Sequence, residues 1–278
     1  AHDWVIKKYN SWGINSKNEQ FGQWRAWERG ISHIDMMSPW VKSLEGQQLS
    51  WSASTKKNGE LGEVVNIPYE SKEKFESWLK TIKGKHVLLG EPDISGRPDY
   101  DIERWAKEKT LEEIRKFRLT KRSRQARNIR KTGYAYSDMI KAIEDAKPAA
   151  IITSNWQGGF GTNTIFSPGS FGISSDTPTV DVSMEDFGLL FRLAESGQKP
   201  TVNINIQSKE LGKVPTYNSI GRIEGVEKPN EYIILSAHLD TTGGGTGATD
   251  NGTGTIVMME AMRILKKIYP NPKRTIIA

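Results

Sequence analysis

The segment that most constrains the fold begins at residue 232, where an apolar strand pattern, a glycine-rich loop and an amphipathic helix follow one another. Residues 232–237 are nearly all apolar, which is typical of a strand in a sheet covered on both faces. Residues 252–268 have helical periodicity and end before Pro270, and residues 273–278 begin another strand. This order predicts a crossover unit of an α/β sheet, with a ligand site at the carboxyl end of the first strand.

His238 lies at that carboxyl end, and Asp240 and Asp250 lie on the loop, where six of the twelve residues 243–254 are glycine. A neutral imidazole is a good zinc ligand, and it binds best when its other ring nitrogen donates to a carboxylate. Asp240 is placed to be that partner. Asp250 precedes a helix, whose dipole favours an anion, and a carboxylate there can bridge two metal ions. The chain has no cysteine, so histidine and carboxylates would have to hold any metal.

Two other interpretations of the loop remain open at this point. A single histidine at a strand end is usually a structural residue with satisfied hydrogen bonds. A strand, a glycine-rich loop and a helix also form the layout that cradles phosphate. However, no Gly-Lys-Ser/Thr sequence follows, and Asp240 and Asp250 would repel a phosphate group unless a metal intervened. The metal interpretation is therefore favoured.

The net charge of +6 comes from one segment, because residues 115–131 contain nine lysines or arginines and no acid. Such a segment is typical of a phosphate-contacting helix in nucleic-acid-binding proteins. Residues 101–113 carry five acids, so the basic residues can instead pair with their neighbours or face solvent. We expect the second use and regard nucleic acid as an unlikely partner. No apolar run approaches the ~20 residues that cross a membrane.

The chain is predicted to have three parts, which are residues 1–55, 56–207 and 208–278. The first part is rich in tryptophan, for which core and interface packing are expected. The second part alternates strands at 64–67, 86–89, 149–153 and 202–206 with helices at 72–82, 102–131 and 136–146. A further helix should begin after Ser183 and end at Gly197. The third part begins with a strand at 217–223.

The residues His238-x-Asp240 and the run Gly-Ala-Thr-Asp-Asn-Gly-Thr-Gly at 247–254 resemble the metal-binding signature of the family-28 zinc metallopeptidases. Residues 217–220 and 273–276 also match the usual flanks of that signature. The family includes leucyl aminopeptidases, plasma-type glutamate carboxypeptidases and, as a non-catalytic relative, the transferrin receptor. The resemblance implies a zinc-exopeptidase-type α/β fold with a mixed sheet flanked by helices. Residues 56–207 are similar to the protease-associated domain that some members insert, and 1–55 and 208–278 would belong to the catalytic domain.

The resemblance also implies the roles of the loop residues. His238 would ligate one zinc ion, Asp250 would bridge two, and Asp240 would orient His238 without touching metal. The Asp250–Asn251 peptide bond would be cis, as in relatives. The implied reaction is exopeptidase hydrolysis of a peptide bond by a water molecule that two zinc ions activate. Aminopeptidase and carboxypeptidase or dipeptidase activities both stay open.

Members of the family also need a Glu-Glu pair after the strand that begins at Thr275, whose first glutamate is the general base, and a further acid and histidine. These residues are absent from the sequence, and its one Glu-Glu pair, Glu112-Glu113, is expected on the surface of a charged helix. We therefore expect only part of the site here, to be completed by a missing C-terminal portion or a second polypeptide. His2, His33 and His86 are expected to be structural or exposed.

The partner implied by the resemblance is a peptide substrate, and a membrane is not expected. The family is typically exported, so a secreted, periplasmic or extracellular location is expected. One alternative is a receptor-like or binding homologue without catalysis. The other alternative is a nucleic-acid-binding protein that uses the basic helix at 115–131.

Overall fold

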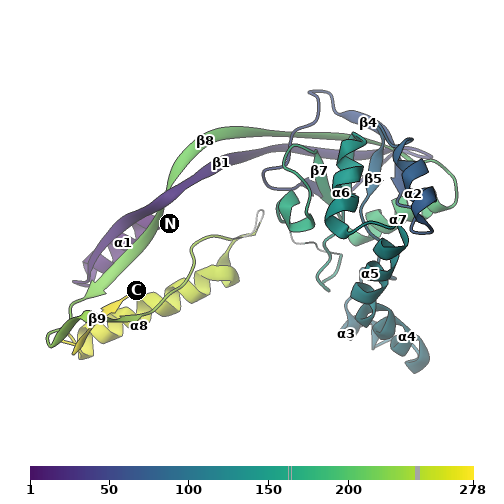
Figure 1. Cartoon of the computed structure of the whole chain (residues 1–278). Helices are drawn as coiled ribbons and strands as arrows, with labels where there is room; N and C mark the ends of the chain where they lie inside the picture. The colour runs from purple at the N-terminus through teal and green to yellow at the C-terminus, as the bar shows by residue number, and fades with distance from the viewer. Residues whose placement is uncertain (162, 164, 242–244) are drawn as a thin grey trace. The chain divides into compact units, whose positions relative to one another are not determined.

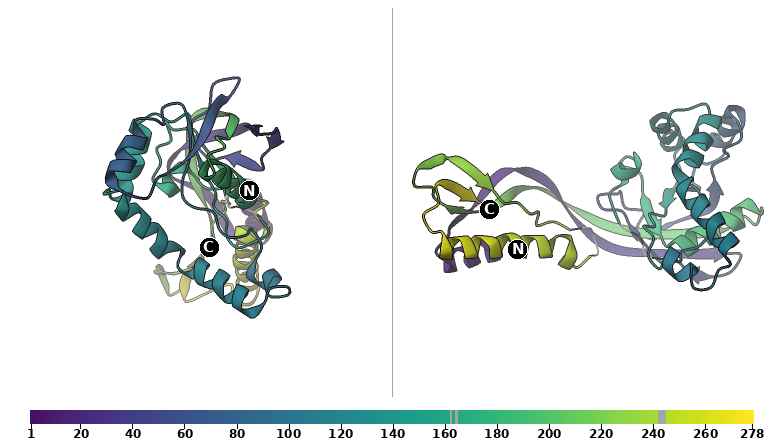
Figure 2. Two further views of the ribbon diagram at one scale, coloured as in Figure 1. Left: turned by 90° about the vertical axis from the view of Figure 1, so that its right-hand side faces the viewer. Right: turned by 90° about the horizontal axis from the view of Figure 1, so that it is seen from below.

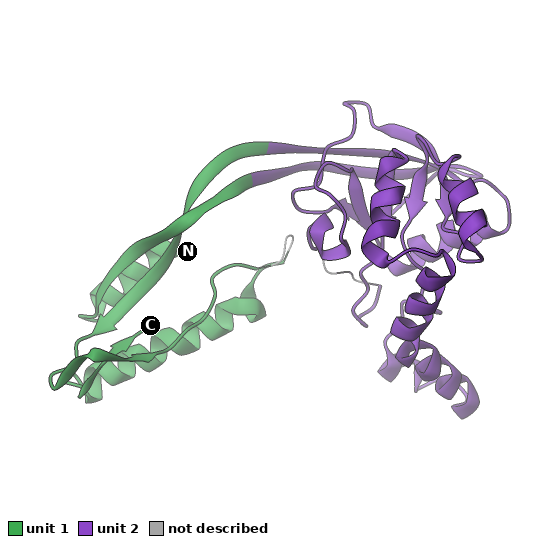
Figure 3. Cartoon of the chain, in the orientation of Figure 1, with its two compact units in different colours: residues 1–26, 210–278 green, residues 27–209 purple. Residues whose placement is uncertain are grey.

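The structure is a computed structural model that describes residues 1–161, 163, 165–241 and 245–278. These residues form two compact units (Figures 1 and 3): unit 1 contains residues 1–26 and 210–278, and unit 2 contains residues 27–209. Two long strands, β1 (Asn15–Ser38) and β8 (Thr201–Ile223), contribute residues to both units. The expected mixed α/β class is confirmed, and the three-part domain division stays a prediction.

Unit 2 is built on parallel strands. β4 (Glu60–Asn66), β5 (His86–Leu88), β6 (Ala150–Thr153) and β7 (Thr179–Val182) pair in this order, each parallel to the next. β8 pairs antiparallel with β4, and β3 (Gly46–Gln48) pairs antiparallel with β7. The short β2 (Lys42–Ser43) pairs with β1. The parallel strands all end at the same edge of the sheet.

Helices cover both faces of this sheet. Successive side chains of a strand point to opposite faces, so Ile151 and Ile152 of β6 belong to different cores. Ile151 packs with the helices α2 (Lys72–Leu79) and α6 (Tyr136–Asp145). Ile152 packs with Phe187 of α7 (Met184–Glu195) and with strand β8. The carboxyl ends of β5 and β6 therefore emerge between two helical layers.

The predicted helix at 102–131 is wrong as a single element. The structure instead has α3 (Asp99–Ile102), α4 (Glu108–Leu119) and α5 (Lys121–Lys131). Thr120 separates α4 from α5 with φ −88° and ψ 1°. Its hydroxyl donates to the carbonyl of Lys116 at 2.8 Å, a local bond that competes with regular helix geometry.

Unit 1 contains α1 (His2–Ser11), β9 (Lys228–Ile234), α8 (Gly254–Ile268) and β10 (Arg274–Ile277). β10 pairs antiparallel with β8 and parallel with β9, and α8 runs beside β9 and β10 (Figure 2). Tyr9, Ile223, Met259, Met262 and Ile276 are among the buried residues of the core. Gly221 is needed because a Cβ there would lie 2.9 Å from the ring of Tyr9.

Three strand predictions need correction. The segments predicted at 202–206 and 217–223 are parts of one strand, β8, and its partner β1 was not predicted. The strand predicted at 232–237 was expected to be covered on both faces, but among the described residues β9 pairs with β10 alone, and Tyr232, Ile233 and Ile234 are 50%, 49% and 69% exposed.

The tryptophans of the first segment are less buried than expected. Trp4, Trp24 and Trp40 are 48%, 63% and 49% exposed, so the prediction of core packing is wrong for these three residues. Trp27 and Trp51 pack on each other with ring centroids 6.1 Å apart. Within the described residues, every helix is too short or too polar to cross a membrane.

Candidate metal centre

The candidate metal ligands lie on the connection from β9 to α8 in unit 1. The chain continues extended past β9, because the amide of Leu235 donates to the carbonyl of Ile277 at 2.8 Å. His238 follows three residues later. The connection enters α8 through η2 (Ala248–Thr253), an irregular turn in which Asp250 and Asn251 have non-helical φ and ψ. His238 and Asp250 therefore sit on opposite arms of one loop, at the carboxyl end of a parallel strand.

The imidazole of His238 lies between two carboxylates. Its Nδ1 is 3.1 Å from Oδ1 of Asp240 and 3.0 Å from the Asp240 carbonyl oxygen. Its Nε2 is 3.1 Å from Oδ1 of Asp250. Both neighbours of Nδ1 are acceptors, so in the tautomer protonated at Nδ1 the ring donates to Asp240 and its Nε2 lone pair faces Asp250. A hydrogen bond of this kind fixes the tautomer of a histidine that ligates metal.

The spacing of Nε2 and the Asp250 carboxylate fits one zinc ion. Ligand atoms about 2.0–2.2 Å from a tetrahedral zinc lie about 3.3 Å or slightly more from each other. The observed 3.1 Å is close to this value. The His238 and Asp250 side chains are 54% and 72% exposed, so solvent reaches both. Across the described ranges, no three His, Asp or Glu side chains are grouped to hold an ion together.

The structure thus places His238 and Asp250 together as candidate ligands, and it places Asp240 against the ring of His238. Asp240 contacts the far ring nitrogen rather than the point that His238 and Asp250 share. The peptide bond between Asp250 and Asn251 is cis, as the resemblance implied.

Two further residues, which sequence reasoning missed, fix the backbone of the loop. The side-chain amide of Asn251 and the hydroxyl of Thr255 each donate to the carbonyl of His238 at 3.3 Å. These bonds tie the two arms of the loop together and hold the His238 backbone in place. The sequence signal for them is weak, because Asn251 and Thr255 are distinguished only by their closeness to Asp250.

The glycines of the loop allow close backbone contacts. A Cβ on Gly252 would lie 2.8 Å from the carbonyl oxygen of Gly247, and Gly247 itself has φ +71°. A Cβ on Gly254 would overlap the side chain of Asn251. Glycine is therefore required at these three positions. Two glycines of the loop, Gly243 and Gly244, lie outside the described residues together with Thr242.

The remaining histidines and the Glu-Glu pair have the structural or exposed surroundings that were predicted. Nδ1 of His2 is 2.8 Å from the hydroxyl of Ser219, His33 is exposed, and His86 is completely buried. Glu112 and Glu113 are exposed on α4.

Several arginines of the basic segment are paired with acids. Arg118 donates to Asp93 at 3.0 Å and also contacts Asp99, and Arg115 pairs with Glu103. Pairing with neighbouring acids was expected, although Glu103 alone comes from the predicted 101–113 set. The cationic side chains of this segment without a partner in the described part of the chain are Lys116, Lys121, Arg122, Arg127, Arg130 and Lys131.

Comparison with known proteins agrees with the fold and with the loop. Residues 218–278 match the sequence model of Peptidase family M28. Carboxypeptidase Q of Xenopus laevis is 26% identical over 90% of this chain and 46% of its own length. The solved Peptidase M28 precursor from Shewanella amazonensis SB2B has a TM-score of 0.67 at 20% identity, over 99% of this chain and 56% of that one.

A second solved structure is BSAP, a zinc aminopeptidase from Bacillus subtilis, with a TM-score of 0.58 at 18% identity. That likeness covers 100% of this chain and 53% of BSAP. The chain thus spans about half the length of the relatives that it matches.

Proposed function

We propose that this chain, which belongs to peptidase family M28, forms one half of a zinc-dependent exopeptidase that hydrolyses peptide bonds. The observation that carries the proposal is the arrangement around His238. One ring nitrogen is held by Asp240 and the other faces the Asp250 carboxylate at 3.1 Å. A neutral imidazole and a carboxylate at this spacing are a donor set that zinc prefers.

In this proposal each of the three residues has a distinct task. Asp240 accepts a hydrogen bond from the Nδ1–H of His238, which would keep Nε2 unprotonated and turned toward a metal. His238 and Asp250 would be the protein ligands that hold the metal, and Asp250 would be the ligand shared with a second ion. Bound zinc would activate a water molecule for attack and polarise the carbonyl of the substrate. Asn251 and Thr255 hold the His238 backbone so that Nε2 keeps its direction.

The chain supplies too few ligands to retain a zinc pair alone. We therefore propose that the general base and the remaining ligands come from residues outside these 278, either a C-terminal continuation or a second polypeptide. We also propose that residues 56–207 form an inserted protease-associated-like domain and that the protein is exported. Among the relatives, carboxypeptidase Q is by name a carboxypeptidase and BSAP is by its description a zinc aminopeptidase. Both exopeptidase activities are therefore to be tested.

The test measures zinc content and hydrolysis in the complete protein. Zinc is counted by mass spectrometry of the purified protein, and aminoacyl anilides, free dipeptides and N-acetylated dipeptides serve as substrates. His238→Ala and Asp250→Asn each remove a ligand and are expected to lower zinc content and reduce kcat/KM at least 100-fold. Asp240→Asn is expected to weaken zinc binding about 10–100-fold, the usual cost of losing such a support.

His33→Ala is the matched control, because His33 is an exposed imidazole outside the loop. It should leave both zinc content and hydrolysis unchanged. A protein that binds no zinc and cleaves none of these substrates would instead be a binding homologue without catalysis. Zinc binding that survives in both His238→Ala and Asp250→Asn would place the metal elsewhere.

A further inference from the structure

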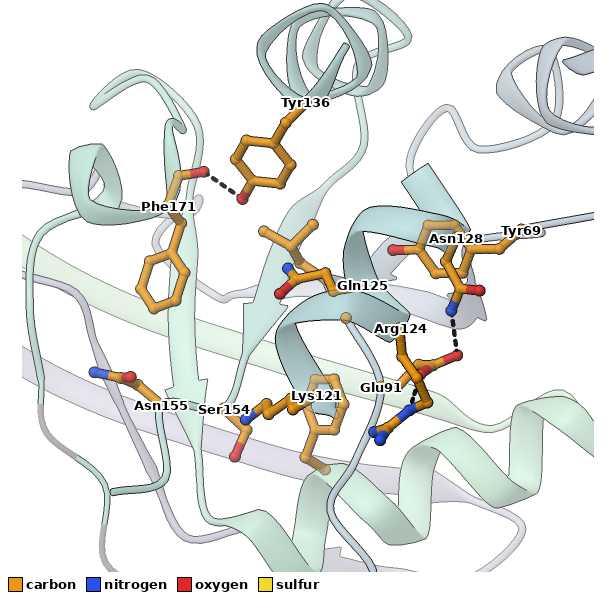
Figure 4. Close-up of a pocket in the computed structure, with 13 residues that line it drawn as sticks. Tyr69, Glu91, Lys121, Arg124, Gln125, Asn128, Tyr136, Ser154, Asn155 and Phe171 are labelled. Carbon is orange, nitrogen blue, oxygen red and sulfur yellow. Dashed lines mark hydrogen bonds and ion pairs between the residues drawn. The ribbon is translucent and has the colours of Figure 1, made fainter. Parts of the chain in front are cut away.

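Unit 2 contains a cavity of about 150 Å³ that lies far along the sequence from the metal loop (Figure 4). Leu89 and Glu91 after β5 and Ser154 and Asn155 after β6 form its floor. Helix α5 forms one wall. The full lining comprises Tyr69, Leu89, Gly90, Glu91, Lys121, Arg124, Gln125, Asn128, Tyr136, Ser154, Asn155, Phe171 and Phe187.

The position of the cavity favours ligand binding. It opens at the edge where the parallel strands β5 and β6 end, between the helical layers of the sheet. Ligands of open α/β sheets bind in the crevice outside the carboxyl ends of the strands. Here the crevice is lined by aromatic and polar side chains together, which is the usual composition of a small-molecule site.

Among the charged side chains that line the cavity, Lys121 is the one that could pair with a ligand. Glu91 accepts a hydrogen bond from Asn128 at 2.7 Å and pairs with Arg124 at 3.8 Å, so these groups satisfy one another. Lys121 has no charged or hydrogen-bonding side-chain partner in the described part of the chain, and it extends from α5 toward the loop of Ser154 and Asn155 (Figure 4). The lining contains two cations, Lys121 and Arg124, and one anion, Glu91. Its net positive charge favours an anionic ligand.

Tyr69 adds a neutral donor. Burial raises the pKa of its hydroxyl well above the ordinary value, and the charge of Glu91 raises it further. The hydroxyl therefore stays protonated, and it lacks a hydrogen-bond partner among the residues that the structure describes. By contrast, the hydroxyl of Tyr136 donates to the carbonyl of Phe171 at 2.8 Å. A ligand acceptor would satisfy Tyr69 at little cost.

The apolar part of the lining sets the size of the occupant. Leu89, Phe171 and Phe187 line the cavity, and Phe187 belongs to the core and is 1% exposed. An apolar cavity of about 150 Å³ holds a molecule the size of benzene. The space therefore suits a single ring or a short branched chain rather than a nucleotide or a sugar chain.

We propose that this cavity binds a ring-sized apolar group that carries a carboxylate. Lys121 provides the charge for the carboxylate, Tyr69 provides a further donor, and Phe171 and Phe187 contact the apolar group. Both a free aromatic acid and the C-terminal residue of a peptide have this chemistry. The cavity lining includes no residue of the His238 loop. Ligand binding in the cavity can therefore be tested independently of the proposed peptidase activity.

The test uses 4-fluorophenylacetate and its neutral amide as probes, observed by ¹⁹F NMR with the 278-residue chain. We expect saturable binding of the acid and at least tenfold weaker binding of the amide. Lys121→Met removes the charge from an exposed helical position and should weaken binding of the acid at least tenfold. Tyr69→Phe should weaken it about threefold.

Arg122→Met is the matched control, because Arg122 is adjacent on α5, exposed, and not part of the cavity lining. It should change the dissociation constant less than twofold, and Asp250→Asn should have no effect. Equal weakening by Lys121→Met and Arg122→Met, equal binding of the acid and the amide, or no saturable binding would each overturn the proposal. A peptide ending in phenylalanine, with a free or an amidated C-terminus, then separates a peptide end from a free acid as the occupant.

Discussion

At the residue scale, the imidazoles of His86 and His238 have opposite surroundings. His86 is completely buried, and its Nε2 lies 3.1 Å and 3.0 Å from the carbonyl oxygens of Glu60 and Val202. It therefore donates from Nε2 as a structural residue, and burial lowers its pKa despite those two carbonyls. His238 is half-exposed and faces carboxylates on both nitrogens. The same side chain is thus a support in one place and a candidate ligand in the other.

Because His86 is buried and its pKa is lowered, we expect the free energy of unfolding to fall in mild acid. The folded protein resists protonation of this ring, whereas the unfolded chain takes up a proton below about pH 6.5. The free energy of unfolding is therefore unaffected by His86 above that pH and falls as the pH drops below it. The slope from one such group is at most about 1.4 kcal/mol per pH unit. Urea unfolding at several pH values between 7 and 5 measures it.

His86→Gln isolates the contribution of this ring, because glutamine keeps an N–H donor near the position of Nε2 and cannot titrate. We expect a shallower pH dependence in this variant than in the parent chain. Identical slopes for His86→Gln and the parent would show that His86 is protonated as readily in the folded state as in the unfolded state.

At the element scale, α7 shows how the residues at its two ends determine where a helix begins and ends. The hydroxyl of Ser183 accepts from the amide of Asp186 at 3.3 Å, and Gly197 with φ +76° follows the end of the helix. The carboxylate of Asp186 in turn accepts from the amide of Glu45 at 2.7 Å and from Lys42 at 2.5 Å. The start of α7 is therefore joined to the segment around β3.

Ser183→Ala is expected to lower the free energy of unfolding of unit 2 by about 1 kcal/mol, because it removes an N-cap acceptor. Chemical denaturation monitored by circular dichroism measures the change. Ser137→Ala is the control, since Ser137 is exposed in the first turn of α6. If both variants lose the same stability, the Ser183 cap contributes nothing beyond an ordinary helical serine.

Elements with such local signals could be predicted from the sequence, and elements without them could not. The helices α2, α6, α7 and α8 were found because their apolar spacing and end residues are local. β1 and the middle of β8 were missed, because residues 207–216 are largely exposed and carry little apolar alternation. What joins these two strands is backbone pairing between segments far apart in the chain. The break at Thr120 was missed because threonine has no strong helix-ending signal.

The residues of the candidate site can be divided in the same way, into those that the sequence identifies and those that only the structure reveals. His238, Asp240 and Asp250 could be selected from the sequence, because imidazole and carboxylates on a glycine-rich loop are unusual as packing residues. Asn251 and Thr255 could not, since their contribution is a pair of hydrogen bonds to one backbone carbonyl. The cavity of unit 2 was also missed. Its lining comes from separate segments, which include the loops after β4, β5 and β6 and the helices α5, α6 and α7, and only the fold brings these together.

At the scale of the whole molecule, the two units have separate hydrophobic cores. Phe187 belongs to a core formed by residues of unit 2, and Met262 belongs to a core formed by residues of unit 1. Both side chains are almost completely buried, at 1% and 0% exposure. Because cooperative unfolding follows the contiguous packing of a core, each unit is expected to unfold as a unit of its own.

This arrangement predicts two unfolding transitions, each of which responds to only one of two core substitutions. Phe187→Ala should lower the stability of unit 2 by about 3–5 kcal/mol, and Met262→Ala should lower that of unit 1 by about 2–5 kcal/mol. Hydrogen exchange during a urea titration assigns each transition, with amides of β6 reporting on unit 2 and amides of α8 on unit 1. A single transition that both substitutions shift would mean that β1 and β8, which contribute to both units, couple them into one cooperative structure.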